Sequence, residues 1–348
     1  MSGGFFQINK LFVTWVILVG SLCLLMSFKS AEPMPVHNCT DSGATWGFFG
    51  HKKINELAIY TLPKEMFGFY KANMDYLIEH SVDPDKRRYG VKGEAECHYI
   101  DMDRYITAEL PYPFDNVPRR WTDAVAKFSE DSLRAHGIVP WNVYNVTSRL
   151  TTAFKNDDIA RVLRLSAELG HYIGDAHVPL HTTSNYNGQK TNQRGIHGFW
   201  ESRLVELYVN DYDFFVGKSF YIKSTQNFIW DRVEESFAAV DSVLGFEREL
   251  NAKFPEDQKY SYETRGQMNL KVYSSEYSRE YSHMLDGQVE RRMRTAVISV
   301  GSYWYTAWVD AGQPDLTKFI TGMDQEVKDS LAIDLVIPEG KLQVRDHE

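Results

Sequence analysis

A stretch of 31 residues, from His171 to Glu201, constrains the fold of this chain most strongly, because it places histidines and acids at helical spacing. His171 and Asp175 are four residues apart, and so are His197 and Glu201. On a helix, side chains four residues apart lie on one face, so both members of a pair can reach a single ion. Two such pairs predict a metal site built between helices of a bundle.

A single pair of this kind is more often a helix-stabilising contact than a metal site. Here a second pair is present, and His181 follows Val178-Pro179-Leu180, which predicts the end of the first helix and a loop after it. Imidazole and carboxylate ligands with little thiol are typical of zinc, and less so of manganese or iron. We therefore expect zinc as the cofactor.

Helical patterns cover most of the remaining chain, while strand signals are sparse. With 43% hydrophobic residues in 348, the chain can bury a large core, so we expect an all-α, multi-helix single domain with a metal cluster in a cleft. Segment 117–155 reads as helix with a break at Pro140, and the charged run from Asp83 to Arg88 reads as a solvated turn. The net charge of −9 argues against stable binding to duplex nucleic acid.

The N-terminal part contains an uncharged apolar run at residues 11–28, which is short for a membrane span. It fits the core of a signal peptide within residues 1–30, and an uncleaved membrane anchor is the alternative. In both cases we expect an exported protein, which is periplasmic, secreted or anchored. Residues 31–45 are polar and contain proline, as in a linker.

The folded domain is expected at residues 46–315, followed by a tail at 316–348 that either packs as an appendage or stays mobile. The exported part has two cysteines, Cys39 and Cys97. In an oxidising compartment they either pair or remain as free thiols, and the sequence does not decide between these states.

In their order and spacing, the histidines and acids between Trp46 and Glu201 resemble those of the superfamily that joins bacterial zinc-dependent phospholipases C to the single-strand-specific zinc nucleases. The resemblance spans about residues 46–315. Its most specific part runs from GHYIGDAHVPLH to IHGFWE, and the other matching motifs are WGFFGH, DPDKR, CHYID and RRMRTAVISVGSYWYTAWVDAG.

The resemblance implies a helical domain with a cluster of three zinc ions, two at minimum, at the bottom of a cleft. For the first ion it implies the ligands Asp83, His98, His171 and Asp175. For the second ion it implies His181, His197 and Glu201, and for the third His51, Trp46 and the bridging Asp175. In the family this tryptophan is the mature N-terminus, because its free amine is a ligand. Trp46 lies 18 residues beyond the apolar run, so either a further cleavage follows Thr45, or Trp46 binds through its carbonyl only, or the third site is altered.

The chemistry that such a cluster supports is the hydrolysis of a phosphodiester, an anion that resists attack by a neutral nucleophile. Divalent ions activate water near neutral pH and neutralise the phosphate oxygens. Asp83 is then the expected general base, and Lys86 or Arg87 is expected to stabilise the phosphoryl charge. His177 and Asp101 are candidates for orienting the ligands, with surface or capping roles as the alternative.

Two substrates fit this resemblance. A glutamate at Glu201, four residues after His197, resembles the phospholipase branch, because the nuclease branch more often has aspartate there. The motifs DAHVPLH and CHYID resemble the nuclease branch at least as much. An acidic chain favours a lipid headgroup, so we expect a phospholipase-C-like phosphodiesterase with transient contact to a membrane surface. The first alternative is a single-strand-specific nuclease, which would need an exposed aromatic side chain such as Trp200, Phe199 or Tyr186. The second alternative is a zinc-binding protein without turnover.

Overall fold

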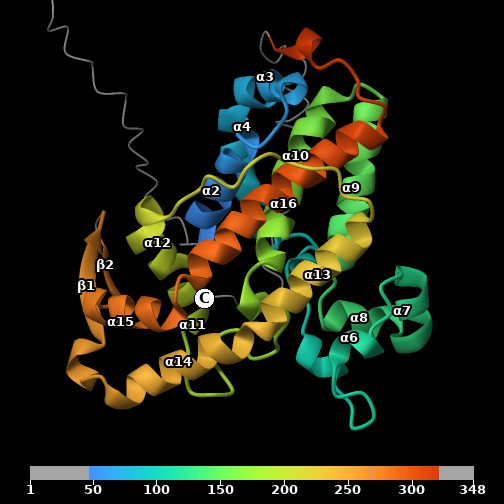
Figure 1. The fold of residues 1–348 in the computed structure, drawn as a ribbon. Helices are drawn as coiled ribbons and strands as arrows, with labels where there is room; N and C mark the ends of the chain where they lie inside the picture. Colours follow the sequence, from blue (N-terminus) through green and yellow to red (C-terminus); the bar gives the residue numbers. More distant parts are fainter. Residues whose placement is uncertain (1–46, 267, 321–348) are drawn as a thin grey trace, which may run out of the picture. The chain divides into compact units, whose positions relative to one another are not determined.

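The computed structural model describes residues 47–266 and 268–320 (Figure 1). This part is helical apart from a two-stranded hairpin, which confirms the expected all-α, multi-helix fold. It belongs to one compact unit, Ala44–Glu348. The predicted leader, the linker, Cys39 and Trp46 lie outside the described residues. No described helix is long and apolar enough to cross a membrane.

Four long helices form the centre of the fold: α2 (Gly47–Ile59), α9 (Val139–Lys155), α10 (Ile159–Ala176) and α16 (Gln288–Asp310) (Figure 1). Helix α10 is buried along most of its length because apolar residues alternate with small ones around it. The Asp158 side chain caps it by accepting a hydrogen bond from the Arg161 amide. It ends at Ala176, before Pro179, as the sequence predicts.

Glycines let α2 lie close to its neighbours. A Cβ atom at Gly170 would collide with the Asn55 side chain, and one at Gly174 would lie 2.9 Å from His51 Nδ1. On α16, a Cβ at Gly301 would collide with Thr61. The close approach brings His51 over the surface of α10, where His171 and Asp175 lie.

The next elements lead toward the site: α3 (Lys64–Ala72), α4 (Met74–Glu79), η1 (His80–Val82) and α5 (Asp83–Arg87). The charged run from Asp83 is therefore a short helix and not the solvated turn that its composition suggests. Asp83 and Pro84 are buried. Pro84 fits this helix because it occupies the first turn, where a missing amide hydrogen costs nothing.

A lateral group of helices comprises α6 (Pro113–Asn116), α7 (Trp121–Phe128) and α8 (Glu130–Ala135). The helical pattern breaks at residues 136–138, directly before Pro140, which lies in the first turn of α9 and starts that helix. A second break falls at Ser129, which has a φ of 68° and caps α8 through its hydroxyl.

Short elements carry most of the site. They are η2 (Ala95–His98), η3 (Met102–Tyr105), η4 (Pro179–Thr182), α11 (Ile196–Gly198), the π-helical turn η5 (Phe199–Arg203), α12 (Leu204–Tyr208) and η6 (Val209–Asp211). The predicted helix near Gly195 is thus present, with a π turn in its middle.

The C-terminal half comprises α13 (Thr225–Ala238), α14 (Val240–Lys253), η7 (Glu256–Gln258), β1 (Tyr260–Arg265), β2 (Met268–Tyr273), α15 (Ser275–Leu285) and η8 (Thr317–Phe319). The antiparallel hairpin pairs Tyr260 with Tyr273, and the latter stacks on Phe199 of the π turn at 3.8 Å between ring centroids. The hairpin therefore supports the segment that carries His197 and Glu201.

The last helix supplies core side chains, since Tyr303, Trp304 and Trp308 are buried. Leu316 is also buried, and Ile320 lies against α3 beside Gly68. The first residues of the expected tail thus pack on the body. Residues 321–348 lie outside the described part, so the domain limits remain predictions.

Candidate metal centre

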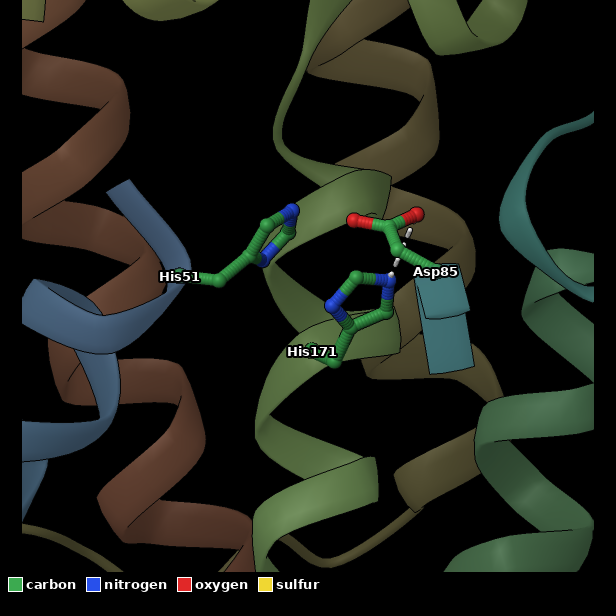
Figure 2. Close-up of side chains that lie close together, drawn as sticks. All are labelled: His51, Asp85 and His171. Carbon is green, nitrogen blue, oxygen red and sulfur yellow. Dashed lines mark ion pairs between the residues drawn. The ribbon is translucent and has the colours of Figure 1, made fainter. Parts of the chain in front are cut away.

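Four side chains from α5, η2 and α10 converge, and their donor atoms lie at the distances expected for ligands of one metal ion. His98 Nδ1 lies 3.0 Å from both His171 Nε2 and Asp175 Oδ2, and the latter two atoms are 3.3 Å apart. Asp85 Oδ1 lies 3.6 Å from His98 Nδ1 and from His171 Nε2. Figure 2 shows Asp85 and His171 directed toward each other, with His51 beside them. Tetrahedral zinc ligands at about 2.0–2.2 Å from the ion are separated by about 3.3–3.6 Å, so this spacing fits zinc.

A second group lies on the loop and the π turn. His181 Nε2 is 3.1 Å from His197 Nε2 and 3.5 Å from Glu201 Oε2, and the last two atoms are 2.7 Å apart. The four-residue spacing of His197 and Glu201 does place both side chains on one face, as the sequence predicts.

Between these two groups lies His51 of α2. Its Nε2 atom is 3.4 Å from Asp175 Oδ1 and 3.6 Å from Glu201 Oε1. The two oxygens of Asp175 therefore face different partners, Oδ2 toward His98 and His171, and Oδ1 toward His51.

The hydrogen bonds of the histidines test whether a cation belongs here. His181 Nδ1 lies 2.6 Å from the His98 carbonyl oxygen, which can only accept a hydrogen bond, so His181 donates from Nδ1 and directs the lone pair of Nε2 into the second group. That lone pair faces His197 Nε2, and His171 Nε2 similarly faces His98 Nδ1. Pairs of buried imidazole nitrogens at this distance need a proton or a cation between them, and the nitrogen and carboxylate donors suit zinc. The residues present therefore fit the ion.

The electrostatics of the metal-free chain agree. Burial lowers the pKa of His98, but hydrogen bonds to Asp175 and Glu94 outweigh it and raise that pKa to about 9. Burial raises the pKa of Asp175, but the charges of His171 and His181 outweigh it and hold the pKa well below its usual range. Protons on His51 and His98 therefore balance the buried carboxylates, whereas burial and the charge of His51 lower the pKa of His171 to about 3.

Behind His98, a buried ionic network fixes the ring. His98 Nε2 lies 3.7 Å from Glu94 Oε1, and the Tyr172 hydroxyl donates a hydrogen bond to the same carboxylate. Arg87 donates from Nε to Glu94 at 3.2 Å and from Nη1 to Glu168 at 2.7 Å. A carboxylate behind a metal-binding imidazole orients the ring and raises its basicity. Arg87, expected at the substrate phosphate, is thus engaged with the acids behind the ligands.

Side-chain hydrogen bonds of Asn187 and Gln193 and a turn at Gly195 hold the loop before His197. Asn187 Oδ1 accepts hydrogen bonds from the amides of Gly195 at 2.8 Å and His197 at 3.4 Å. Gln193 donates to the buried Glu247 at 2.7 Å, which ties this loop to α14. Gly195 has a φ of 93°, a conformation that favours glycine.

The structure brings together His51, His98, His171, Asp175, His181, His197 and Glu201, but not Asp83. Asp83 accepts hydrogen bonds from His80 Nδ1 at 2.6 Å and from Lys86 Nζ at 2.9 Å, so Lys86 is also turned to Asp83. The carboxylate that faces the histidines is Asp85. The motif Asp83-Pro84-Asp85 offered two carboxylates, and only the course of α5 distinguishes them. Trp46 lies outside the described residues.

The remaining candidates have other contacts. His177 Nδ1 donates to the Ile173 carbonyl at 2.7 Å, within its own helix, and the ring faces Ser299. Asp101 is buried, and its amide donates to the His136 carbonyl. Phe199 and Trp200 are buried in the core, so neither is an exposed platform for a base.

Solvent reaches the centre at its carboxylates. The side chains of Asp85 and Glu201 are 20% and 14% exposed, whereas the five histidines of the groups are at most 4% exposed. A substrate would therefore approach between Asp85 and Glu201.

Imidazole and carboxylate donors that converge in this way within a helical fold define the class of zinc-dependent hydrolases. The family model of the S1/P1 nucleases matches residues 46–298. The chain belongs to the S1/P1 nuclease family and is a zinc-dependent phosphodiesterase. A search of curated proteins found no match. The family match favours the nuclease alternative over the phospholipase-C-like function that the sequence led us to expect.

Proposed function

We propose that this protein hydrolyses the phosphodiester bonds of single-stranded nucleic acid at a cluster of three zinc ions. The observation that carries this proposal is the convergence of His98, His171, Asp175 and Asp85 with donor atoms 3.0–3.6 Å apart in a member of the S1/P1 nuclease family. The export that residues 11–28 predict agrees with this function, because S1/P1 nucleases are typically secreted.

We assign Asp85 the position that the resemblance gave to Asp83. The proposed ligands of the first ion are Asp85, His98, His171 and Asp175. Those of the second ion are His181, His197 and Glu201, and those of the third are His51 and Asp175. The backbone of Trp46 remains a candidate for the third ion.

Bound zinc would supply the Lewis acidity that activates water and neutralises the phosphate oxygens. Asp85, the most exposed of these ligands, is placed to orient the attacking water and accept its proton. Arg88 Nη1 lies 3.8 Å from Asp85 Oδ1, and its side chain is buried. We therefore assign to Arg88 the stabilisation of phosphoryl charge that Lys86 and Arg87 were expected to provide.

An aromatic groove supports a polynucleotide substrate. A cavity of about 560 Å³ is lined by Trp121, Trp141 and Tyr144 and by the cations of Arg120 and Arg134. Cys97, the chain neighbour of His98, also lines it. Aromatic rings stack on bases without regard to sequence, while arginines attract the phosphate backbone. A lipid headgroup would need no such surface.

The test compares substrates and two tyrosine variants. With zinc, the wild-type protein should release nucleotides from single-stranded DNA, cleave duplex DNA more slowly and leave phosphatidylcholine intact, and a chelator should stop the reaction. Release of diacylglycerol without nucleotides would support the phospholipase, and no turnover at all would support a zinc-binding protein.

Tyr144, which is 47% exposed, provides the finer test. Tyr144→Ala should raise the KM for single-stranded DNA roughly 5- to 100-fold, since stacking one base contributes about 1–3 kcal/mol. Its rate on the small ester bis(p-nitrophenyl) phosphate should not change. Tyr262→Ala, which removes a tyrosine that is 75% exposed on β1, is the matched control and should affect neither substrate.

A further inference from the structure

Glu201 presents its two carboxylate oxygens to two different sets of ligands. Oε2 faces the second group, at 2.7 Å from His197 Nε2 and 3.5 Å from His181 Nε2. Oε1 faces the other side, at 3.6 Å from His51 Nε2. Asp175 Oδ1 is 3.4 Å from the same nitrogen, so His51, Asp175 and Glu201 form a separate group of three donors.

The backbone around Glu201 makes this double contact possible. Glu201 lies in the π-helical turn Phe199–Arg203, a rare conformation that is frequent at functional sites. Helix α2 meets it with small residues: a Cβ atom at Gly47 would lie 3.3 Å from Glu201 Oε1, and one at Gly50 would lie 3.9 Å from the Glu201 carbonyl. Any larger residue at Gly47 would compete for the space beside Oε1.

We propose that Glu201 bridges the second and third metal positions, so that both Asp175 and Glu201 are ligands of the third ion. This inference rests on the proposed zinc cluster and changes its third position. His51 also lies within ligand range of Asp85 and His171, but the proposed first ion uses both of these residues, so without Glu201 the third position would have only His51 and the bridging Asp175 among the described side chains. With Glu201 it has three protein ligands, the number that catalytic zinc sites use while they keep one position open for water or substrate. The third ion would then not depend on a free amine at Trp46.

Shortening the bridge tests it. Glu201→Asp removes one methylene, so a single carboxylate can no longer reach both groups, and we expect the protein to lose zinc. Glu201→Gln keeps the length but replaces one oxygen by a nitrogen that does not bind zinc, which guards against a packing defect in the shorter variant. Zinc per folded chain is measured by elemental analysis of the full chain after gel filtration.

A double variant distinguishes a Glu201 that bridges two ions from a Glu201 that binds the second ion alone. His51→Ala removes the third position, so we expect three ions in the wild type and two in His51→Ala. If Glu201 serves that same ion, His51→Ala/Glu201→Asp should hold as many ions as Glu201→Asp alone. One ion fewer in the double variant would show that the two residues serve different ions and would overturn the bridge. Wild-type zinc content retained in both Glu201 variants would overturn it as well.

The zinc counts that test the bridge and the activity assay that tests the proposed function can fail independently of each other. A wild type that binds zinc but cleaves no phosphodiester would contradict the proposed function, while the ion counts would still decide the bridge. An active wild type with additive zinc losses would contradict only the bridge.

Discussion

Asp83 and Asp85 are separated by one proline, yet α5 turns their carboxylates to different partners. Asp83 binds His80 and Lys86, while Asp85 faces His98 and His171. His171, His181 and His197 could be predicted from the sequence, since their spacing within one short stretch is a local property, whereas His51 and His98 came from the family resemblance. The choice between two nearby acids could not, because it depends on how α5 lies against α10.

Exchanging each acid for its amide should separate these roles. Asp85→Asn should lower phosphodiesterase activity by about 100-fold or more and reduce the zinc content, because one ligand oxygen of the first ion is replaced. Asp83→Asn should keep the zinc and most of the activity, and it should lose about 1–3 kcal/mol of stability as its charged hydrogen bonds weaken. Activity assays, elemental analysis and urea unfolding measure these effects. Loss of zinc and activity in Asp83→Asn but not in Asp85→Asn would mean that Asp83, and not Asp85, binds the first ion.

The acid behind His98 allows a second prediction at this scale. Glu94→Gln removes the charge that orients the ring and is expected to weaken zinc binding by about 10- to 100-fold, as measured by competition with a chromogenic chelator. Glu96→Gln, a neighbouring change at an acid that pairs with Arg134 at 3.4 Å, is the control and should leave the affinity unchanged. Equal affinities in the two variants would mean that Glu94 has no role in orienting His98.

At the scale of elements, the site depends on how closely α2 approaches α10. Sequence periodicity predicts both helices but not their separation, which Gly170 and Gly174 set by removing side chains from the contact. The four-residue spacing of these glycines was a readable signal, and it lies within the same motif as His171 and Asp175. The β1–β2 hairpin was missed because its strands are short and half exposed.

Adding one methyl group at this contact should disturb the centre. Gly174→Ala places a Cβ 2.9 Å from His51 Nδ1, so we expect a loss of about 1–3 kcal/mol in unfolding free energy and weaker retention of one zinc ion. Gly245→Ala on α14 meets nothing within 4 Å and should be neutral or slightly stabilising, because alanine favours helix. Chemical unfolding and zinc analysis of both variants decide the matter. A stable, fully loaded Gly174→Ala protein would show that the contact can relax.

For the whole molecule, the metal centre joins segments that are distant in sequence. Donors come from α2, α5, η2, α10, η4, α11 and the π turn, and protons on His51 and His98 balance the buried carboxylates where no ion is bound. Ions that bind only the folded state stabilise it, by about 4 kcal/mol for each ion present at a thousand times its Kd. The cluster should therefore act as a cross-link of the fold as well as a reaction centre.

Chelation should accordingly lower the melting temperature by on the order of 10 °C or more, and zinc should restore it. Differential scanning calorimetry with and without chelator measures this change. An unchanged melting temperature after verified metal removal would mean that the helices hold the donors in place without ions.

The most direct test of the account is an anomalous difference map at the zinc absorption edge from crystals of the zinc-loaded protein. We predict peaks within bonding distance of Asp85, His98, His171 and Asp175, of His181, His197 and Glu201, and of His51. If the map shows no peaks beside these side chains, or shows the first ion bound by Asp83, the account of the metal centre is wrong.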